Sequence, residues 1–129
     1  MPELIDVKPM VAGIGEVLWD VLGDTETLGG APVNFAYHVG QLGTTALAIS
    51  SIGDDVRGQR AISTLMEYRV ATDHITVIDG APTGYVQASV DSGGVATYVF
   101  PDEVAWDRIR IDSTTMELVS RLHAVCFGS

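Results

Sequence analysis

The sequence has 129 residues, of which 47% are hydrophobic and 19% charged, a balance typical of a globular chain and not of a disordered one. Its formal net charge is −10 and Lys8 is its only lysine, which argues against nucleic-acid binding and against attraction to an anionic membrane. One cysteine excludes an internal disulfide, no apolar stretch approaches the roughly 18 residues of a membrane span, and the N-terminus lacks signal-peptide character, so we expect a cytoplasmic protein.

The first fifty residues predict one helix with strands before and after it. Pro32 suits the first helical position, because its missing N–H would have no partner there, and Gly43 suits the stop. In chain order, the expected elements are a buried strand at 10–14, an apolar run at 17–22, a glycine turn at 28–30, a helix from 32 to about 43, and a buried strand at 45–50.

The rest of the chain predicts two helices and four strands. Asp54 or Asp55 suits the cap of the first helix, and Thr114 with Glu117 has capping-box spacing ahead of the second. β-rich runs flank a D-S-G-G stretch at 91–94 and predict a hairpin. The expected elements are a helix from about 54 to 68, strands at 75–78, 83–90 and 95–100, a helix from about 114 to 121, and a buried strand at 124–127.

This order of elements predicts an α/β fold. Alternating strands and helices favour a Rossmann-like parallel sheet flanked by helices. The hairpin and the run at 17–22 do not fit the alternation, so we expect them to form a small antiparallel appendage. A core strand at 124–127 with nothing after it would leave a sheet edge uncovered, which favours a fragment of a longer protein.

Familiar catalytic motifs are not found. Gly13 and Gly15 give G-x-G after a strand, but Leu18 stands where a dinucleotide fingerprint needs glycine, and no phosphate-binding P-loop motif exists. Cys126 lies in an apolar run, which favours a small core residue over a nucleophile. The three histidines share no metal-ligand spacing, so we predict no metal site. They are His38, His74 and His123. A surface or packing role is favoured for His38.

Four residues have a ligand-binding interpretation beside a structural one. Asp20 either points into solvent from a half-exposed strand or accepts hydrogen bonds from vicinal hydroxyls. Gly29 and Gly30 either form a tight turn or let a ligand lie against bare backbone. Asn34 is either solvated or supplies the donor and acceptor that a sugar hydroxyl needs. Trp19 and Trp106 could likewise stack on a ligand or pack in a core, and the residues alone leave these pairs open.

Four stretches, taken together and in order, resemble the N-terminal half of PfkB-type sugar kinases, the ribokinase/fructokinase superfamily. The glycine-asparagine stretch is the most specific, and its GGAPVN form is closer to fructokinase-like members than to ribokinase. The stretches are GEVLWDVLGD at 15–24, LGGAPVNFAYHVGQLG at 28–43, SIGDDVRG at 51–58 and TYVFPDEVAWD at 97–107.

The resemblance implies a ribokinase-like fold and ATP-dependent phosphate transfer to a sugar hydroxyl. It implies that Asp20, Gly30 and Asn34 hold the sugar, with Gly29 allowing close approach. The segments near 17–22, 83–90 and 95–100 would form an antiparallel lid that excludes water. Such a lid often serves as a dimer contact, which would place Trp19, Tyr98 and Phe100 at a ligand or homodimer interface.

The sequence departs from the family in its catalytic half. It has no G-A-G-D-type motif with the catalytic Asp and no N-x-x-E motif, so the base, the ATP and Mg²⁺ sites and any monovalent cation site would lie outside it. We therefore predict no catalytic residue in this chain and no kinase activity from it alone. Two alternatives stay open: a naturally short, non-catalytic sugar- or nucleoside-binding or dimerisation module, and a kinase acting on a nucleoside or 2-keto-3-deoxygluconate.

Overall fold

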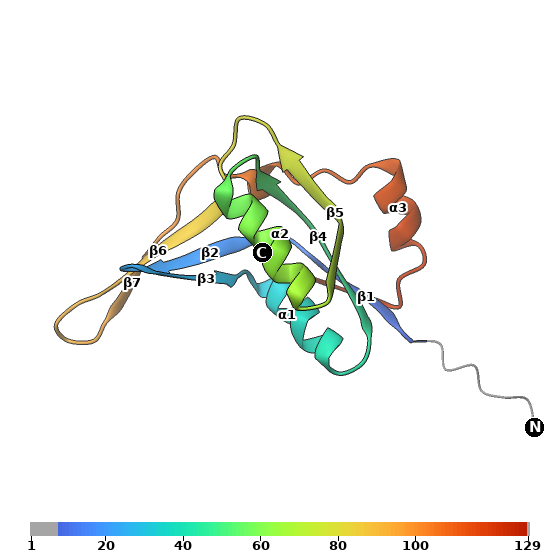
Figure 1. Ribbon diagram of the computed structural model, residues 1–129, viewed down its shortest axis with the longest axis horizontal. Coiled ribbons are helices and arrows are strands. Elements are labelled where there is room, and N and C mark those ends of the chain that lie inside the picture. The colour runs from blue at the N-terminus through green and yellow to red at the C-terminus, as the bar shows by residue number, and fades with distance from the viewer. Residues whose placement is uncertain (1–7, 129) are drawn as a thin grey trace, which may run out of the picture.

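The computed structural model describes residues 8–128, which build two four-stranded sheets with three helices (Figure 1). Sheet A has the order β5-β4-β1-β8 and sheet B the order β3-β2-β6-β7. The strands are β1 (Met10–Ile14), β2 (Leu18–Leu22), β3 (Thr25–Gly29), β4 (Thr45–Gly53), β5 (Val70–Ile78), β6 (Gly84–Val90), β7 (Ala96–Val99) and β8 (Ala124–Phe127). The helices are α1 (Ala31–Gln41), α2 (Val56–Glu67) and α3 (Ser113–Val119), with a 3-10 turn η1 (Ala105–Arg108).

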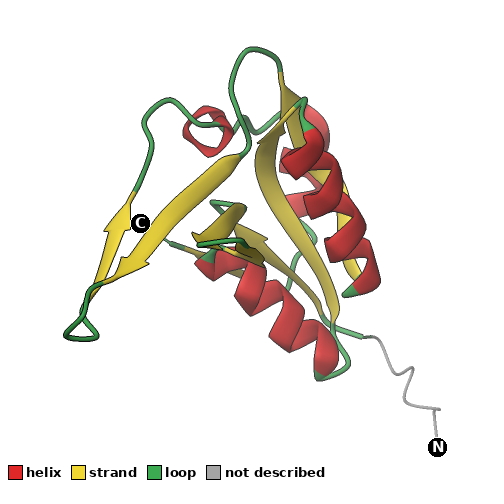
Figure 2. Cartoon of the chain, turned by 60° about the vertical axis from the view of Figure 1, so that its left-hand side comes forward, coloured by secondary structure: helices red, strands yellow, loops and turns green. Residues whose placement is uncertain are grey.

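Sheet A is parallel throughout and carries the core of the molecule. Alternate residues of its central strand β4 pack against opposite layers, because side chains in a strand alternate between faces. Ala48 and Ile52 belong to the larger cluster, with residues of α1 and α2, whereas Leu47 and Ile49 pack toward α3. The predicted parallel α/β architecture is therefore confirmed, with helices on both faces (Figure 2).

Sheet B extends away from the α/β core as a second, smaller sheet (Figure 1). It contains the expected hairpin, since β6 and β7 pair antiparallel around a turn in which the Asp91 carboxylate accepts from two backbone N–H groups. However, β2 pairs with β6 in parallel. The appendage is therefore a mixed sheet and not a purely antiparallel one, because β2 and β6 belong to different connections from sheet A.

Two strands, β3 and β5, differ from the prediction. The segment before Gly30 is a strand, β3, that pairs antiparallel with β2, so Gly29 ends a strand and only Gly30 makes the turn. Three polar residues in T-E-T-L-G conceal this strand, because one of its faces is exposed. β5 begins at Val70, well before the predicted 75–78, and pairs with β4 along most of its length.

The C-terminal elements give two corrections. The cap of α3 is Asp112, whose carboxylate accepts from Thr115 N–H at 2.7 Å, so the Thr114–Glu117 capping box is wrong. β8 is largely exposed, with Phe127 at 79%, and Cys126 is only partly covered, so the predicted buried strand is also wrong. β8 is an edge strand of sheet A, held on β1 alone, and its other side has no neighbour among residues 8–128.

The start of β8 is tied to the start of β1 by two hydrogen bonds. Met10 N–H donates to Nδ1 of His123 at 3.0 Å, and His123 N–H donates to the Met10 carbonyl at 2.8 Å. These bonds join residues 113 positions apart in the chain. They account for His123 as a structural residue.

Candidate functional site

The residues predicted to bind a ligand gather where β1 leads into sheet B and where α1 begins. Ligands of α/β proteins bind beyond the carboxyl ends of parallel strands, and this is such a position. Asp20 lies on β2, Gly29 ends β3, Gly30 precedes α1 and Asn34 lies in its first turn. The antiparallel pairing of β2 and β3 brings Asp20 beside Gly29, and Gly30 and Asn34 follow in the chain at the start of α1.

The Asp20 carboxylate lies directly against the backbone of Gly29. A Cβ atom on Gly29 would stand 2.5 Å from Oδ2 of Asp20, which is closer than two such atoms can approach. Gly29 has no positive φ, so its requirement for glycine is steric and comes from this carboxylate. Asp20 is exposed, and its free oxygen lone pairs can accept hydrogen bonds from a ligand.

The start of α1 explains the G-x-G of the first strand. Gly13 and Gly15 both lie against Pro32: added Cβ atoms would meet the Pro32 carbonyl oxygen at 2.1 Å and its Cγ at 2.7 Å. These glycines therefore allow α1 to rest on the end of β1. The close helix–strand packing fixes the helix start that carries Asn34.

Gly30 turns the chain into α1 with a φ of 110°, a conformation that favours glycine. Any Cβ there would also lie 2.3 Å from the Glu16 carbonyl oxygen. Because Gly30 has no side chain to cap the helix, the Glu16 carboxylate supplies a partner from outside, accepting from Ala31 N–H at 3.2 Å. Sequence reasoning missed this role of Glu16, since the two residues are paired only by the fold.

Asn34 is exposed in the first turn of α1, where its backbone N–H donates to the Gly30 carbonyl at 2.9 Å. Its side-chain amide makes no hydrogen bond with residues 8–128, so both the donor and the acceptor are available to a ligand. α1 begins at Ala31, one residue before the predicted start, so Pro32 is its second residue, while Gly43 follows the helix end with a positive φ as predicted.

The three aromatic residues assigned to a lid lie in different surroundings. Trp19 is 4% exposed, and strand alternation puts it on the face of β2 opposite Asp20, against α2. Phe100 follows β7 and, with Glu16, Leu18 and Trp106, lines a hollow of about 220 Å³. Tyr98 is exposed further along β7.

Trp106 packs flat on the start of β6. A Cβ on Gly84 would lie 2.0 Å from the indole ring, so this glycine makes room for the tryptophan. Trp106 thereby packs η1, of which it is part, against the start of β6 in sheet B. Of the two tryptophans, it is the one that borders the hollow and can meet a ligand there.

Asp55 joins α2 to sheet B. Its carboxylate caps α2 by accepting from Gly58 N–H at 2.8 Å, and it also accepts from the N–H and the hydroxyl of Thr83, just before β6. Burial alone would raise the pKa of Asp55, but the hydrogen bonds from Thr83 and Gly58 outweigh it and leave the pKa below its usual value. The cap was predicted, whereas its bonds to Thr83 could not be.

Two of the histidines have other surroundings. His38 is exposed on α1, and Nδ1 of His74 lies 3.0 Å from the Thr115 hydroxyl on the opposite face of sheet A. Among residues 8–128, no three His, Cys, Asp or Glu side chains converge as metal ligands. No helix within this range has the length and apolar character to cross a membrane.

Residues 3–118 match the model of the pfkB family carbohydrate kinases. An uncharacterised sugar kinase of Pyrococcus horikoshii is 30% identical over 93% of this chain and 42% of its own length. Fructokinase of Solanum tuberosum is 30% identical over 83% of this chain and 36% of its length. This chain thus spans about two fifths of these relatives.

Solved structures show the same fold. The P. horikoshii sugar kinase in complex with ATP has a TM-score of 0.77 at 29% identity, over 92% of this chain and 42% of that one. Fructokinase of Xylella fastidiosa with bound ATP has a TM-score of 0.85 at 24% identity, over 94% and 39% respectively. The ribokinase-like fold expected from the sequence is therefore confirmed.

Proposed function

This chain belongs to the pfkB family of carbohydrate kinases, and we propose that it is the N-terminal portion of an ATP-dependent sugar kinase. The whole protein would transfer the γ-phosphate of ATP to a hydroxyl of a fructose-like sugar. The observation that carries this proposal is the contact between the Asp20 carboxylate and the bare backbone of Gly29 beside the start of α1.

The contact holds a hydroxyl-binding carboxylate against the end of β3, just before α1. Asp20 would accept from sugar hydroxyls, while the Asn34 amide would donate to one hydroxyl oxygen and accept from another. Gly29 and Gly30 are buried, and the Asp20 carboxylate and the Glu16 carbonyl fill the space beside them, so these glycines would support the sugar site by making room for those groups. A site of this kind recognises neutral polyhydroxylated molecules, which supports a sugar as the substrate.

Sheet B would close over the bound sugar as a lid. Closure excludes water, which suppresses ATP hydrolysis and strengthens the hydrogen bonds and charges inside the site. Phe100 and Trp106, beside the hollow next to Glu16, would border the sugar from the lid side. Trp19 would support the lid from behind, because its indole is buried on the other face.

The phosphate-transfer groups would lie outside this chain. Catalysis of phosphate transfer rests mainly on positioning and on charge stabilisation by an anion site and a metal ion. Residues 8–128 offer no convergent metal ligands, so we assign neither Mg²⁺ nor a monovalent cation to them. ATP as the donor is supported by the ATP complex of the P. horikoshii relative. The chain alone would then be inactive.

We propose the exposed face of sheet B as a homodimer contact. Tyr98 and Phe100 are 58% and 61% exposed, and Leu22, on β2, is 52% exposed. Large apolar side chains grouped on one sheet are typical of an interface and uncommon on a monomer surface. Neither nucleic acid nor a membrane is proposed as a partner, and a cytoplasmic location stays a prediction.

The test is a coupled ADP-release assay on the full gene product that contains this chain. Fructose, ribose, adenosine and 2-keto-3-deoxygluconate would be compared as acceptors, which separates the fructose-like proposal from its alternatives. Asp20→Asn and Asn34→Ala should each raise the sugar KM by about tenfold or more. The 129-residue chain is the inactive control. If no sugar is phosphorylated, or if the short chain is active, the proposal is wrong.

A further inference from the structure

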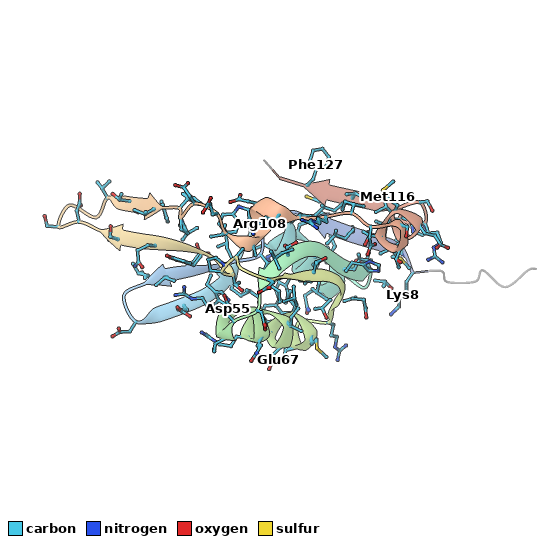
Figure 3. All side chains as sticks on the ribbon, turned by 90° about the horizontal axis from the view of Figure 1, so that it is seen from above. Lys8, Asp55, Glu67, Arg108, Met116 and Phe127 are labelled. Carbon is cyan, nitrogen blue, oxygen red and sulfur yellow. The ribbon has the colours of Figure 1, made fainter. Side chains whose placement is uncertain are left out.

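Two arginines of α2 contact three neighbouring strands of sheet B, namely the edge strand β3 and the inner strands β2 and β6. The N-terminal half of α2 lies beside sheet B, close to Asp55, which is labelled in Figure 3. Arg57 and Arg60 are three positions apart, so both project from one side of the helix. They meet one side chain from each strand: Glu26 of β3, Trp19 of β2 and Tyr85 of β6.

Glu26 is the ionic centre of this group. Nη2 of Arg57 lies 2.5 Å from Oε1 of Glu26, and Nη1 of Arg60 lies 2.7 Å from Oε2, so each carboxylate oxygen has its own guanidinium. Hydrogen bonds from Arg57 and Arg60 lower the pKa of Glu26, which keeps its carboxylate ionised. The Glu26 side chain is only 22% exposed, less than that of either arginine.

The aromatic contacts extend the group across the sheet. The Arg60 guanidinium lies 4.4 Å from the centre of the Trp19 ring and that of Arg57 lies 4.6 Å from the Tyr85 ring, both within cation–π range. In addition, Trp19 Nε1–H donates to the Arg57 carbonyl at 3.0 Å. Trp19 is thus fixed to α2 by its ring face and by its N–H.

These contacts lie on the face of β2 opposite Asp20, the residue proposed to bind the sugar. Trp19 and Asp20 are consecutive on β2, so they point to opposite faces. Because both side chains are carried by β2, a rotation of β2 relative to α2 that displaces Trp19 also displaces Asp20. A groove of about 550 Å³ lined by Trp19, Glu26 and Arg60 separates parts of the sheet from α2, so the arginines bridge a space that is not fully packed.

We propose that Arg57 and Arg60, held by Glu26, form a clamp that sets the angle of sheet B against α2 and thereby positions Asp20 for the sugar. Arg57 and Arg60 are positioning residues in this proposal, since they act through β2 and touch no substrate. The inference rests on the proposed sugar kinase function. It adds a connection from α2 to the sugar site, which makes sugar affinity depend on an ion pair outside that site.

The test uses Glu26→Gln, Arg60→Gln and the double variant in the full gene product. This double-mutant cycle isolates the coupling energy between Glu26 and Arg60, because glutamine at each position keeps most of the side-chain volume. Glu67→Gln, at the other end of α2 (Figure 3), is the matched control that removes a carboxylate outside the clamp. The readouts are the KM values for sugar and for ATP, and amide hydrogen exchange in the strands of both sheets.

We expect each single variant to raise the sugar KM by about three- to tenfold, to leave the ATP KM unchanged, and to show no further loss in the double variant. Amides of β2 and β3 should exchange faster, while those of β1 and β4 stay unchanged. The Glu67→Gln variant should match the wild type in every readout.

Two results would overturn the clamp. One is an unchanged sugar KM together with unchanged exchange in β2 and β3. The other is a parallel change in both KM values with faster exchange in both sheets, which is general destabilisation. If the wild-type protein phosphorylates no sugar, the proposed function fails by itself, and the exchange data still decide whether the arginines hold sheet B.

Discussion

Replacing Gly29 by alanine tests the sugar site through a residue that has no side chain to bind a ligand. The new Cβ would lie 2.5 Å from Oδ2 of Asp20, so the carboxylate must swing away from the backbone. Asp20 is exposed and free to move, so the free energy of unfolding should change by less than about 1 kcal/mol. The cost should therefore appear in sugar binding.

The expected size follows from the bonds that Asp20 would lose. A hydrogen bond to a charged group contributes about 1.5–3 kcal/mol, which corresponds to a rise in sugar KM of about 10- to 150-fold. The assay is steady-state kinetics on the full gene product, with a urea melt of each variant. Gly40→Ala, whose Cβ would meet only Ala46 Cβ at 3.4 Å, is the control at the far end of α1.

A double-mutant cycle makes the reasoning refutable. If Gly29→Ala acts by moving the carboxylate, it should add nothing to Asp20→Ala, because the group it displaces is already gone. Additive effects of the two substitutions on the sugar KM would show that Gly29 acts independently of Asp20. An unchanged KM in Gly29→Ala would show that the position of the carboxylate is unimportant for the sugar.

Three further predictions concern stability and assembly. Gly30→Ala should lower the free energy of unfolding by about 2 kcal/mol or more in a urea melt, because it combines a φ of 110° with a Cβ 2.3 Å from a backbone oxygen; a smaller loss would mean that the turn can relax. Asp55→Asn should cost about 1–3 kcal/mol at neutral pH. Folding lowers the pKa of Asp55 from its ordinary value of 3.8, so the extra stability of the wild type over Asp55→Asn should be complete above pH 3.8 and should be lost as the pH falls through the pKa of the folded state. A stability difference that does not change with pH would contradict this role of the Asp55 carboxylate. Phe100→Ser should convert a dimer of the full gene product into a monomer in light scattering, and a monomeric wild type would exclude the lid contact.

The sequence predicted most of the fold where local signals and burial agree. Pro32 and Gly43 predicted the ends of α1 to within two residues, and the apolar run of β4 forms the centre of the parallel sheet. β3 was missed because hydrophobic and polar residues alternate only weakly in T-E-T-L-G. Its strand conformation depends on pairing with β2, which is a tertiary contact. The cap of α3 was misplaced because Asp112 and Thr114 both have suitable side chains, and only the backbone path chooses between them.

The site was predictable in its residues but not in their contacts. Asp20, Gly29, Gly30 and Asn34 were selected by residue type and resemblance, and the structure places Asp20 against Gly29, with Gly30 and Asn34 at the adjoining start of α1. That Gly29 makes room for Asp20 depends on the register of β2 with β3, which no local pattern encodes. Trp19 was grouped with the lid aromatics because sequence cannot tell which face of β2 meets α2.

The pairing of β1 with β8 has a consequence for how the molecule folds. Closing a loop of 113 residues costs about 1 kcal/mol more chain entropy than the shorter closure that pairs β1 with β4. The β1–β4 pair with α1 is therefore the better candidate for the folding nucleus, and β8 would join after the main barrier. Substitutions at the His123–Met10 junction should then speed unfolding and leave the refolding rate nearly unchanged.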